Sequence, residues 1–175
     1  RVRDEIVRPT LSSLSERGNP FVGYLYVGVM LTDHGPQLVE FNVRLGDPEA
    51  QCILPRLADG AFLELCARTA RGELAGYRLD WDPRTVVAVV AAAEGYPRAP
   101  RKCDPITIAP SLETADRWLD HAGIGLDGER LVTHGGRVAA VVARGKTVSE
   151  ARTSAYEGDK ALCFDGMHRR DDNGA

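Results

Sequence analysis

The sequence predicts an α+β fold, in which antiparallel strands and helices follow one another along 175 residues. The first indication is a pair of segments rich in aromatic and branched residues, 21–32 and 37–45, joined by the turn "DHGP" at 33–36. The second is a set of helix patterns with start and stop signals. This length suits one domain or two small ones.

Composition narrows the class of protein. With 43% hydrophobic and 27% charged residues, the chain is typical of globular proteins. A net charge of -3 gives no sign of the basic surface that is typical of nucleic-acid-binding proteins. The longest apolar run, "VVAVVAAA" at 86–93, is too short to span a bilayer. Without a signal peptide or metal-like cysteine spacing, we expect a cytoplasmic protein with no membrane partner.

Helices are expected through much of the first half. Residues 1–20 carry apolar positions on one face, and Gly18 is a suitable stop. A short helix over 48–57 should bend near Pro55, because proline cannot donate the backbone hydrogen bond. A stronger helix covers 61–71 and ends at the glycine that follows.

A linker divides the sequence. Residues 79–84, "LDWDPR", favour a boundary that gives domains at 1–81 and 82–175. The second domain opens with a continuous apolar run at 85–93, which predicts a buried strand.

The rest of the second half alternates between both element types. A capped helix is expected over 112–121, closed by Gly123, and two strands should flank "THGG" at 133–136. Thr147 and Glu150 have the spacing of a capping box and should open a last helix. One face of that helix is expected to carry Val148, Ala151, Ala155 and Leu162.

The strand over 37–45 carries unusual polar residues. Alternation puts Glu40, Asn42 and Arg44 on one face. The other face carries Val39, Phe41, Val43 and Leu45. A carboxylate and an amide two residues apart offer oxygens that Mg²⁺ prefers, and a guanidinium can grip phosphate or carboxylate. A solvated face with a Glu–Arg cross-pair is the alternative, and spacing alone leaves both open.

A second candidate is "THGGRV" at 133–138. Gly135 and Gly136 would let the backbone approach a ligand and present N–H groups to an anion, and Arg137 adds charge. A simple glycine turn between strands is the alternative.

Four stretches together resemble one family. "GVMLTDHGPQLVEFNVRLGDPEAQCILPRL", "EGYPR", "THGGRVAAVVARG" and "FDGMHRRD" follow the order and spacing of phosphoribosylamine–glycine ligases, of the ATP-grasp superfamily. The resemblance runs over nearly the whole chain. It implies that residues 1–81 form the C-terminal part of an ATP-grasp domain, an antiparallel hairpin plus helices. Residues 82–175 would be a small β-rich α+β C-terminal domain.

The resemblance also implies a reaction and its residues. ATP, glycine and 5-phosphoribosylamine would give glycinamide ribonucleotide, ADP and phosphate through a glycyl phosphate, in purine biosynthesis. Glu40 and Asn42 would hold Mg²⁺ or Mn²⁺, and Arg44 would stabilise the transferring phosphoryl group. Asp47 would hold the glycine amine or the aminosugar. The ribose phosphate would contact Gly135, Gly136 and Arg137.

The sequence departs from the family in three places. After "YP" the family has glycine, where this chain has Arg98, and the family's Lys–Gly pair is Lys102–Cys103 here. The family's "HAGT" reads "HAGI", so Ile124 lacks the hydroxyl. We assign the loop at 97–105 no role.

The resemblance covers only the family's C-terminal portion. We therefore expect a missing N-terminal part of the same polypeptide, and weak ATP binding and no activity for this chain alone. Two alternatives stay open: a non-catalytic remnant that binds a partner protein, and another ATP-grasp ligase.

Overall fold

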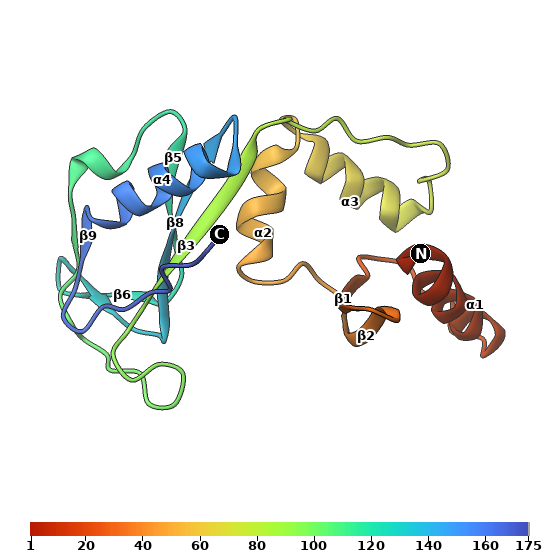
Figure 1. Cartoon of the computed structure of the whole chain (residues 1–175), viewed down its shortest axis with the longest axis horizontal. Helices are drawn as coiled ribbons and strands as arrows, with labels where there is room; N and C mark the ends of the chain where they lie inside the picture. Colours follow the sequence, from red (N-terminus) through yellow and green to blue (C-terminus); the bar gives the residue numbers. More distant parts are fainter. Residues whose placement is uncertain (175) are drawn as a thin grey trace. The chain divides into compact units, whose positions relative to one another are not determined.

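The computed structural model describes residues 1–174, which form two compact units. The first unit comprises Arg1–Ala50 and Ala58–Asp80, and the second comprises Gln51–Leu57 and the chain from Trp81 onward. The helices and strands of each are drawn in Figure 1. Every strand pair is antiparallel, which confirms the α+β fold. Among the described residues, no helix is long and apolar enough to cross a membrane.

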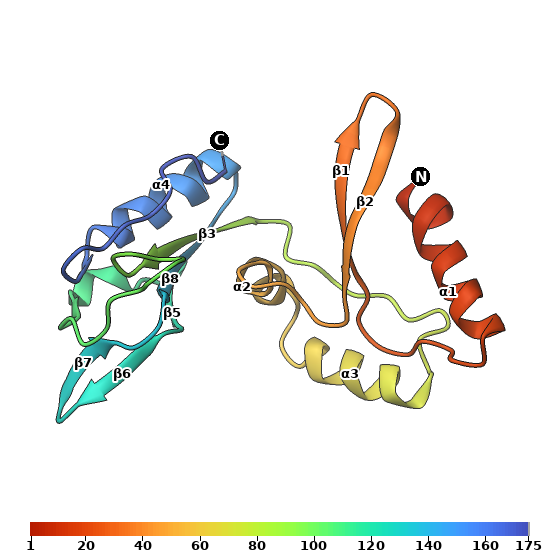
Figure 2. The same ribbon diagram turned by 90° about the horizontal axis from the view of Figure 1, so that it is seen from below.

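The first unit is a hairpin with helices. Its elements are the π-helix η1 (Arg3–Val7), α1 (Arg8–Glu16), β1 (Tyr26–Thr32), β2 (Gly35–Asn42) and α3 (Ala61–Arg71). Figure 2 shows β1 and β2 as a long two-stranded ribbon. The predicted helix at 61–71 is confirmed, and Gly72 ends it with φ 70°, a conformation that favours glycine.

A short helix lies where the sequence predicts one. The helix α2 (Glu49–Ile53) is followed by the 3₁₀ turn η2 (Leu54–Arg56), so the regular helix stops beside Pro55 as expected.

The hairpin differs from its prediction at the end of the second strand. β2 stops at Asn42, so the prediction that the strand continues to Leu45 is wrong. The register also shifts between Gly28 and Val29, which leaves Val39 as an extra residue in a β-bulge. The apolar side chains are not buried, and Val39 is 65% exposed. The bulge interrupts the alternation only at Val39. The apolar side chains stay exposed because β2 has β1 as its only strand partner among the described residues.

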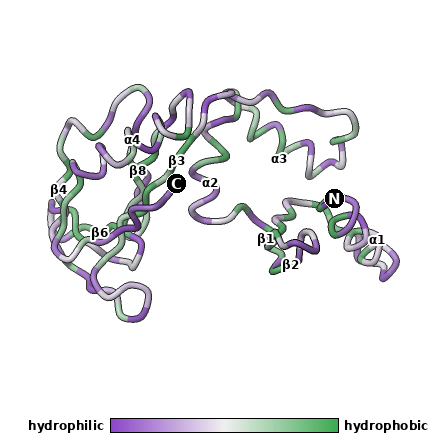
Figure 3. Tube along the Cα trace, viewed as in Figure 1, coloured by the Kyte–Doolittle hydropathy of each residue, from purple (hydrophilic) through white to green (hydrophobic). Residues whose placement is uncertain are grey.

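The second unit is built on a three-stranded sheet. Its order is β3 (Thr85–Ala92), β8 (Arg137–Gly145) and β5 (Arg117–His121), with α4 (Val148–Asp159) packed against it. β8 is central, and its residues 138–143 are buried. Figure 3 shows the apolar character of β3 and β8. The buried strand predicted over 85–93 is therefore confirmed.

Two small ladders complete the second unit. One pairs β6 (Ile124–Asp127) with β7 (Arg130–Thr133), and the other pairs β4 (Thr107–Ile108) with β9 (Leu162–Cys163). Strands do flank "THGG", but β7 and β8 pair with other strands rather than with each other.

The helix predicted over 112–121 is wrong. A 3₁₀ turn, η3 (Pro110–Leu112), is followed by β5 instead. Trp118 and Leu119 lie opposite buried valines of β8, so pairing with a distant strand overrides the local helix pattern. Arg117, whose side chain is mostly buried, donates to backbone carbonyls in η3 and α4 and fixes the strand's start.

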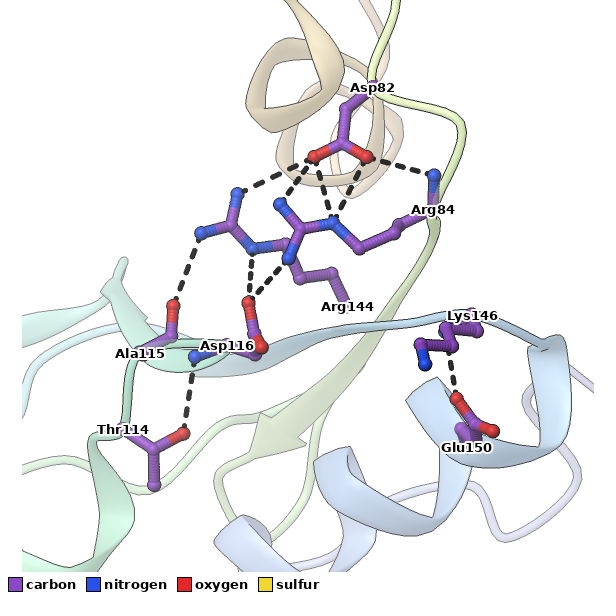
Figure 4. Close-up of polar contacts among 8 residues, drawn as sticks. All are labelled: Asp82, Arg84, Thr114, Ala115, Asp116, Arg144, Lys146 and Glu150. Atoms are coloured by element: carbon purple, nitrogen blue, oxygen red, sulfur yellow. Dashed lines mark hydrogen bonds and ion pairs between the residues drawn. The ribbon is translucent and has the colours of Figure 1, made fainter.

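The last helix begins as predicted. The Glu150 amide donates to the Thr147 hydroxyl at 3.1 Å, and the Glu150 carboxylate accepts from the Lys146 amide at 2.8 Å, a contact drawn in Figure 4. Ala151 is fully buried against the sheet. Leu162 lies in β9, beyond the helix end at Asp159, so its place on the helix face is wrong.

Candidate functional site

Glu40 and Asn42 lie together on β2 of the first unit. The Asn42 Nδ2 donates to the Glu40 Oε1 at 3.0 Å, so both side chains are on one side of the strand. Gly28 is the residue opposite Glu40, and a Cβ there would lie 3.0 Å from the Glu40 Cγ. The missing side chain of Gly28 thus leaves room for the carboxylate arm.

The alternative Glu–Arg cross-pair is not formed in the structure. The Arg44 Nη1 donates to the Leu45 carbonyl at 2.9 Å, and both residues lie past the strand end. Glu40 has Asn42 as its side-chain partner instead. Of the three polar residues predicted on one strand face, Glu40 and Asn42 lie on β2, and Arg44 lies in the turn that follows.

The Glu40–Asn42 pair fits a hard divalent cation. Among residues 1–174, no group of three or more His, Cys, Asp and Glu side chains could hold a metal by itself. Mg²⁺ commonly takes one or two carboxylates and completes its shell with waters and phosphate oxygens. Amide oxygen and nitrogen exchange places by a half-turn, so Asn42 can present its oxygen beside the Glu40 carboxylate. The two side chains would therefore offer the cation two oxygen ligands on one face of β2.

The turn after β2 is held by residues that the sequence analysis missed. The Tyr26 hydroxyl donates to the Glu49 Oε1 over a long 3.5 Å, and Tyr26 is the register partner of Asn42. The Glu49 carboxylate lies over Gly46, where any Cβ would collide with it. Asp47 is exposed between these residues. The signal for this arrangement in the sequence is the glycine of "GDPE", three residues before the glutamate.

The glycines of "THGG" serve close backbone packing in the second unit. The Gly135 N–H donates to the Gly123 carbonyl at 3.1 Å, and a Cβ on Gly123 would lie 2.6 Å from the Gly135 Cα. The Tyr96 ring packs on Gly136, leaving no space for a side chain there. The Gly136 carbonyl accepts from the Ala93 amide at 2.8 Å. The glycine-turn interpretation accounts for Gly135, and the predicted phosphate contact stays a prediction.

Arg137 follows directly as the first residue of β8 and is half-buried. The structure places the predicted site residues of the two groups in different units. The first unit holds Glu40, Asn42, Arg44 and Asp47, and the second holds Gly135, Gly136 and Arg137.

The loop at 97–105 is strained at one residue. Cys103 has φ 67°, the one non-glycine residue in the left-handed region among residues 1–174. Its amide donates to the carbonyl of buried Thr133 at 2.7 Å, and the Thr133 hydroxyl accepts from the Asp104 amide at 3.0 Å. These bonds tie the loop to the end of β7, beside "THGG". A glycine at position 103 would adopt this conformation without strain.

Comparison with known families gives matches over both units. Residues 86–175 match the family model described as phosphoribosylglycinamide synthetase, C domain. Residues 1–50 match the model described as phosphoribosylglycinamide synthetase, ATP-grasp (A) domain.

Individual relatives agree with these matches. The chain is 41% identical over 175 residues to the phosphoribosylamine–glycine ligase of Vibrio vulnificus (strain YJ016), and 43% identical to that of Ralstonia nicotianae. In both cases 99% of this chain is covered. The crystal structure of the Thermotoga maritima phosphoribosylamine–glycine ligase superposes over 97% of this chain, with a TM-score of 0.82 and 36% identity. The chain spans 41% of the length of each of these proteins.

Proposed function

Because the chain belongs to the phosphoribosylglycinamide synthetase family, we propose that it is part of an ATP-dependent ligase that joins glycine to 5-phosphoribosylamine. The products are glycinamide ribonucleotide, ADP and phosphate. The chain spans 41% of its relatives, so the complete reaction also needs the ATP-grasp part that precedes this portion in them. On this proposal, residues 1–81 complete the ATP-grasp domain, residues 82–175 are the C-terminal domain, and the enzyme is cytoplasmic.

The Glu40–Asn42 contact of 3.0 Å carries this proposal. Together these side chains would hold Mg²⁺ or Mn²⁺, which supplies positive charge next to the phosphate oxygens of ATP. Phosphoryl transfer needs mostly positioning and charge neutralisation, and two oxygens held by one strand meet the first need. Gly28 supports the role because it gives the Glu40 side chain its place on the hairpin.

The remaining roles follow the charges of the side chains. Arg44 stabilises the transferring phosphoryl group, since its guanidinium can grip phosphate oxygens in pairs. Asp47, exposed after the strand, holds the glycine amine or the aminosugar. Arg137 and the backbone at Gly136 contact the ribose phosphate, with Gly135 serving the close approach of the two loops.

The experiment is a pair of substitutions in the complete ligase that contains this chain. We expect Glu40→Ala to lower glycine-dependent ATP hydrolysis with phosphoribosylamine by at least about a hundredfold, comparable with the loss of one electrostatic contact in other enzymes. Glu73→Ala, which removes an exposed carboxylate after α3, is the matched control. Activity retained in the Glu40 variant and a normal Mn²⁺ requirement would contradict the metal role.

A second candidate, a protein-binding module, is favoured by the hairpin surface. Val43 is 71% exposed and Leu31 is 78% exposed, and both edges of the two-stranded sheet lack a further strand among the described residues. The two candidates separate in one assay. A complete polypeptide that contains this chain and lacks glycine-dependent ATP hydrolysis would favour the binding module over the ligase.

A further inference from the structure

A pocket in the second unit has no part in the proposed reaction. Its volume is about 570 Å³, within the range of about 300–1,000 Å³ that is usual for small-molecule sites. Two stretches of chain line it: the end of α2 with η2, and residues 81–86, which lead into the start of β3. The lining residues are Cys52, Ile53, Arg56, Trp81, Thr85 and Val86.

The cation of this pocket is oriented by the backbone. The Arg56 Nε donates to the Asp82 carbonyl at 3.1 Å, and the guanidinium carbon lies 5.9 Å from the centre of the Trp81 ring. Among residues 1–174, no carboxylate forms an ion pair with Arg56. Its terminal nitrogens are the natural contact for an anion.

The acidic side chains nearby are already used by other arginines. The Asp82 carboxylate pairs with Arg84 at 2.6 Å and with Arg144 at 3.8 Å. Asp116 accepts from both Arg84 and Arg144 at 2.8 Å, as Figure 4 shows. Arg84 and Arg144 thus share both carboxylates, and the Arg56 guanidinium contacts Asp82 only through its backbone carbonyl.

The pocket also offers a flat aromatic surface. Trp81 is 46% exposed, although its backbone is held by a β-bridge to Leu57. Large aromatic side chains left open beside a cation are typical of sites that stack a planar group. Ile53 and Val86 supply apolar walls, and Thr85 adds a hydroxyl. The combination suits a ligand with a planar ring at one end and a single anionic group at the other.

We propose that this pocket binds a nucleoside monophosphate, with the base on Trp81 and the phosphate on Arg56. One guanidinium with one unpaired charge matches one phosphate group, and the volume exceeds what a free phosphate or a small carboxylate would fill. The site uses none of the residues proposed for ligation, so it stands or falls separately from the ligase proposal.

The test is calorimetric titration of the complete polypeptide that contains this chain with AMP in the presence of EDTA, which removes any metal-dependent nucleotide binding. We expect one AMP per chain, and at least tenfold weaker binding of adenosine and of inorganic phosphate. Arg56→Met should weaken AMP at least tenfold while adenosine binding stays unchanged. Trp81→Leu should weaken both AMP and adenosine, and Trp81→Phe should keep most of the affinity.

Matched controls separate the site from general effects. Arg68→Met removes a comparable guanidinium–aromatic pair in the first unit, where Arg68 lies 4.7 Å from the Tyr77 ring centre, and should leave AMP binding unchanged. Glu40→Ala should also bind AMP normally. Absence of saturable AMP binding, equal affinity for phosphate alone, or full affinity in a folded Arg56→Met variant would each overturn the proposal. Near-ultraviolet circular dichroism verifies the fold of every variant.

Discussion

Replacing Cys103 with glycine is expected to stabilise the second unit, because this residue is held in the left-handed region at φ 67°. A left-handed conformation costs a residue with a Cβ about 1–2 kcal/mol. Glycine removes that cost but loses about 0.5–1 kcal/mol through the greater freedom of the unfolded chain. Cys103 is exposed, so little burial is lost with its thiol. At the midpoints of these ranges the net gain is about 0.75 kcal/mol, which corresponds to about 3–6 °C in Tm for a domain near 100 residues.

The assay is thermal and urea unfolding of the wild-type chain beside two variants. Cys103→Ala removes the thiol but keeps the Cβ and therefore the strain, so its stability should stay close to wild type. Cys163→Gly, at an exposed cysteine in β9, should destabilise, because glycine weakens a strand without relieving any strain. The reasoning fails if Cys103→Gly is no more stable than Cys103→Ala.

Two further predictions concern the second unit. Gly158→Ala should lower the free energy of unfolding in urea by about 1–2 kcal/mol, because the new Cβ would collide with the mostly buried Arg117 side chain. Overpacking of this kind costs about 1–3 kcal/mol, which exceeds the helix propensity that alanine gains over glycine. Thr153→Ala on the exposed face of α4 should show no such loss, and equal stability of the two variants would refute the packing argument. Hydrogen bonds from Arg84 lower the pKa of Asp82 to about 2, below its value in the unfolded chain. The stability that the Asp82–Arg84 pair contributes is therefore present above about pH 4 and lost as the pH falls toward about 2. If an Asp82→Asn variant shows the same pH dependence of unfolding between about pH 2 and 4, the pair makes no such contribution.

Local patterns in the sequence were enough to predict several elements. The helix α3 with its terminal Gly72, the buried strand β3 and the Thr147 cap of α4 each depend on residues within a few positions of one another. The same holds for the central pair of the candidate site. Glu40 and Asn42 share a side of β2 because strand side chains repeat every two residues, and no distant contact is needed to bring them together.

Other features depended on distant contacts. Residues 117–121 carry a helix-like pattern, yet they form β5 because β8, more than 15 residues further along the chain, offers an unpaired edge. The stop of β2 at Asn42, which moves Arg44 into the turn, likewise follows from where β1 begins, because Tyr26 is the first residue of β1 and pairs with Asn42. The left-handed Cys103 is held by Thr133 from another strand.

The sequence by itself determined which side chains bear oxygen atoms or charge, and at what spacing they and the apolar residues recur. Tertiary structure alone decided which of them meet: Tyr26 with Glu49 across the turn, and Arg56 with Trp81 across two segments of chain. The physical reason is that local propensities differ by about 1 kcal/mol or less per residue, so strand pairing and burial against distant residues outweigh them wherever the two disagree.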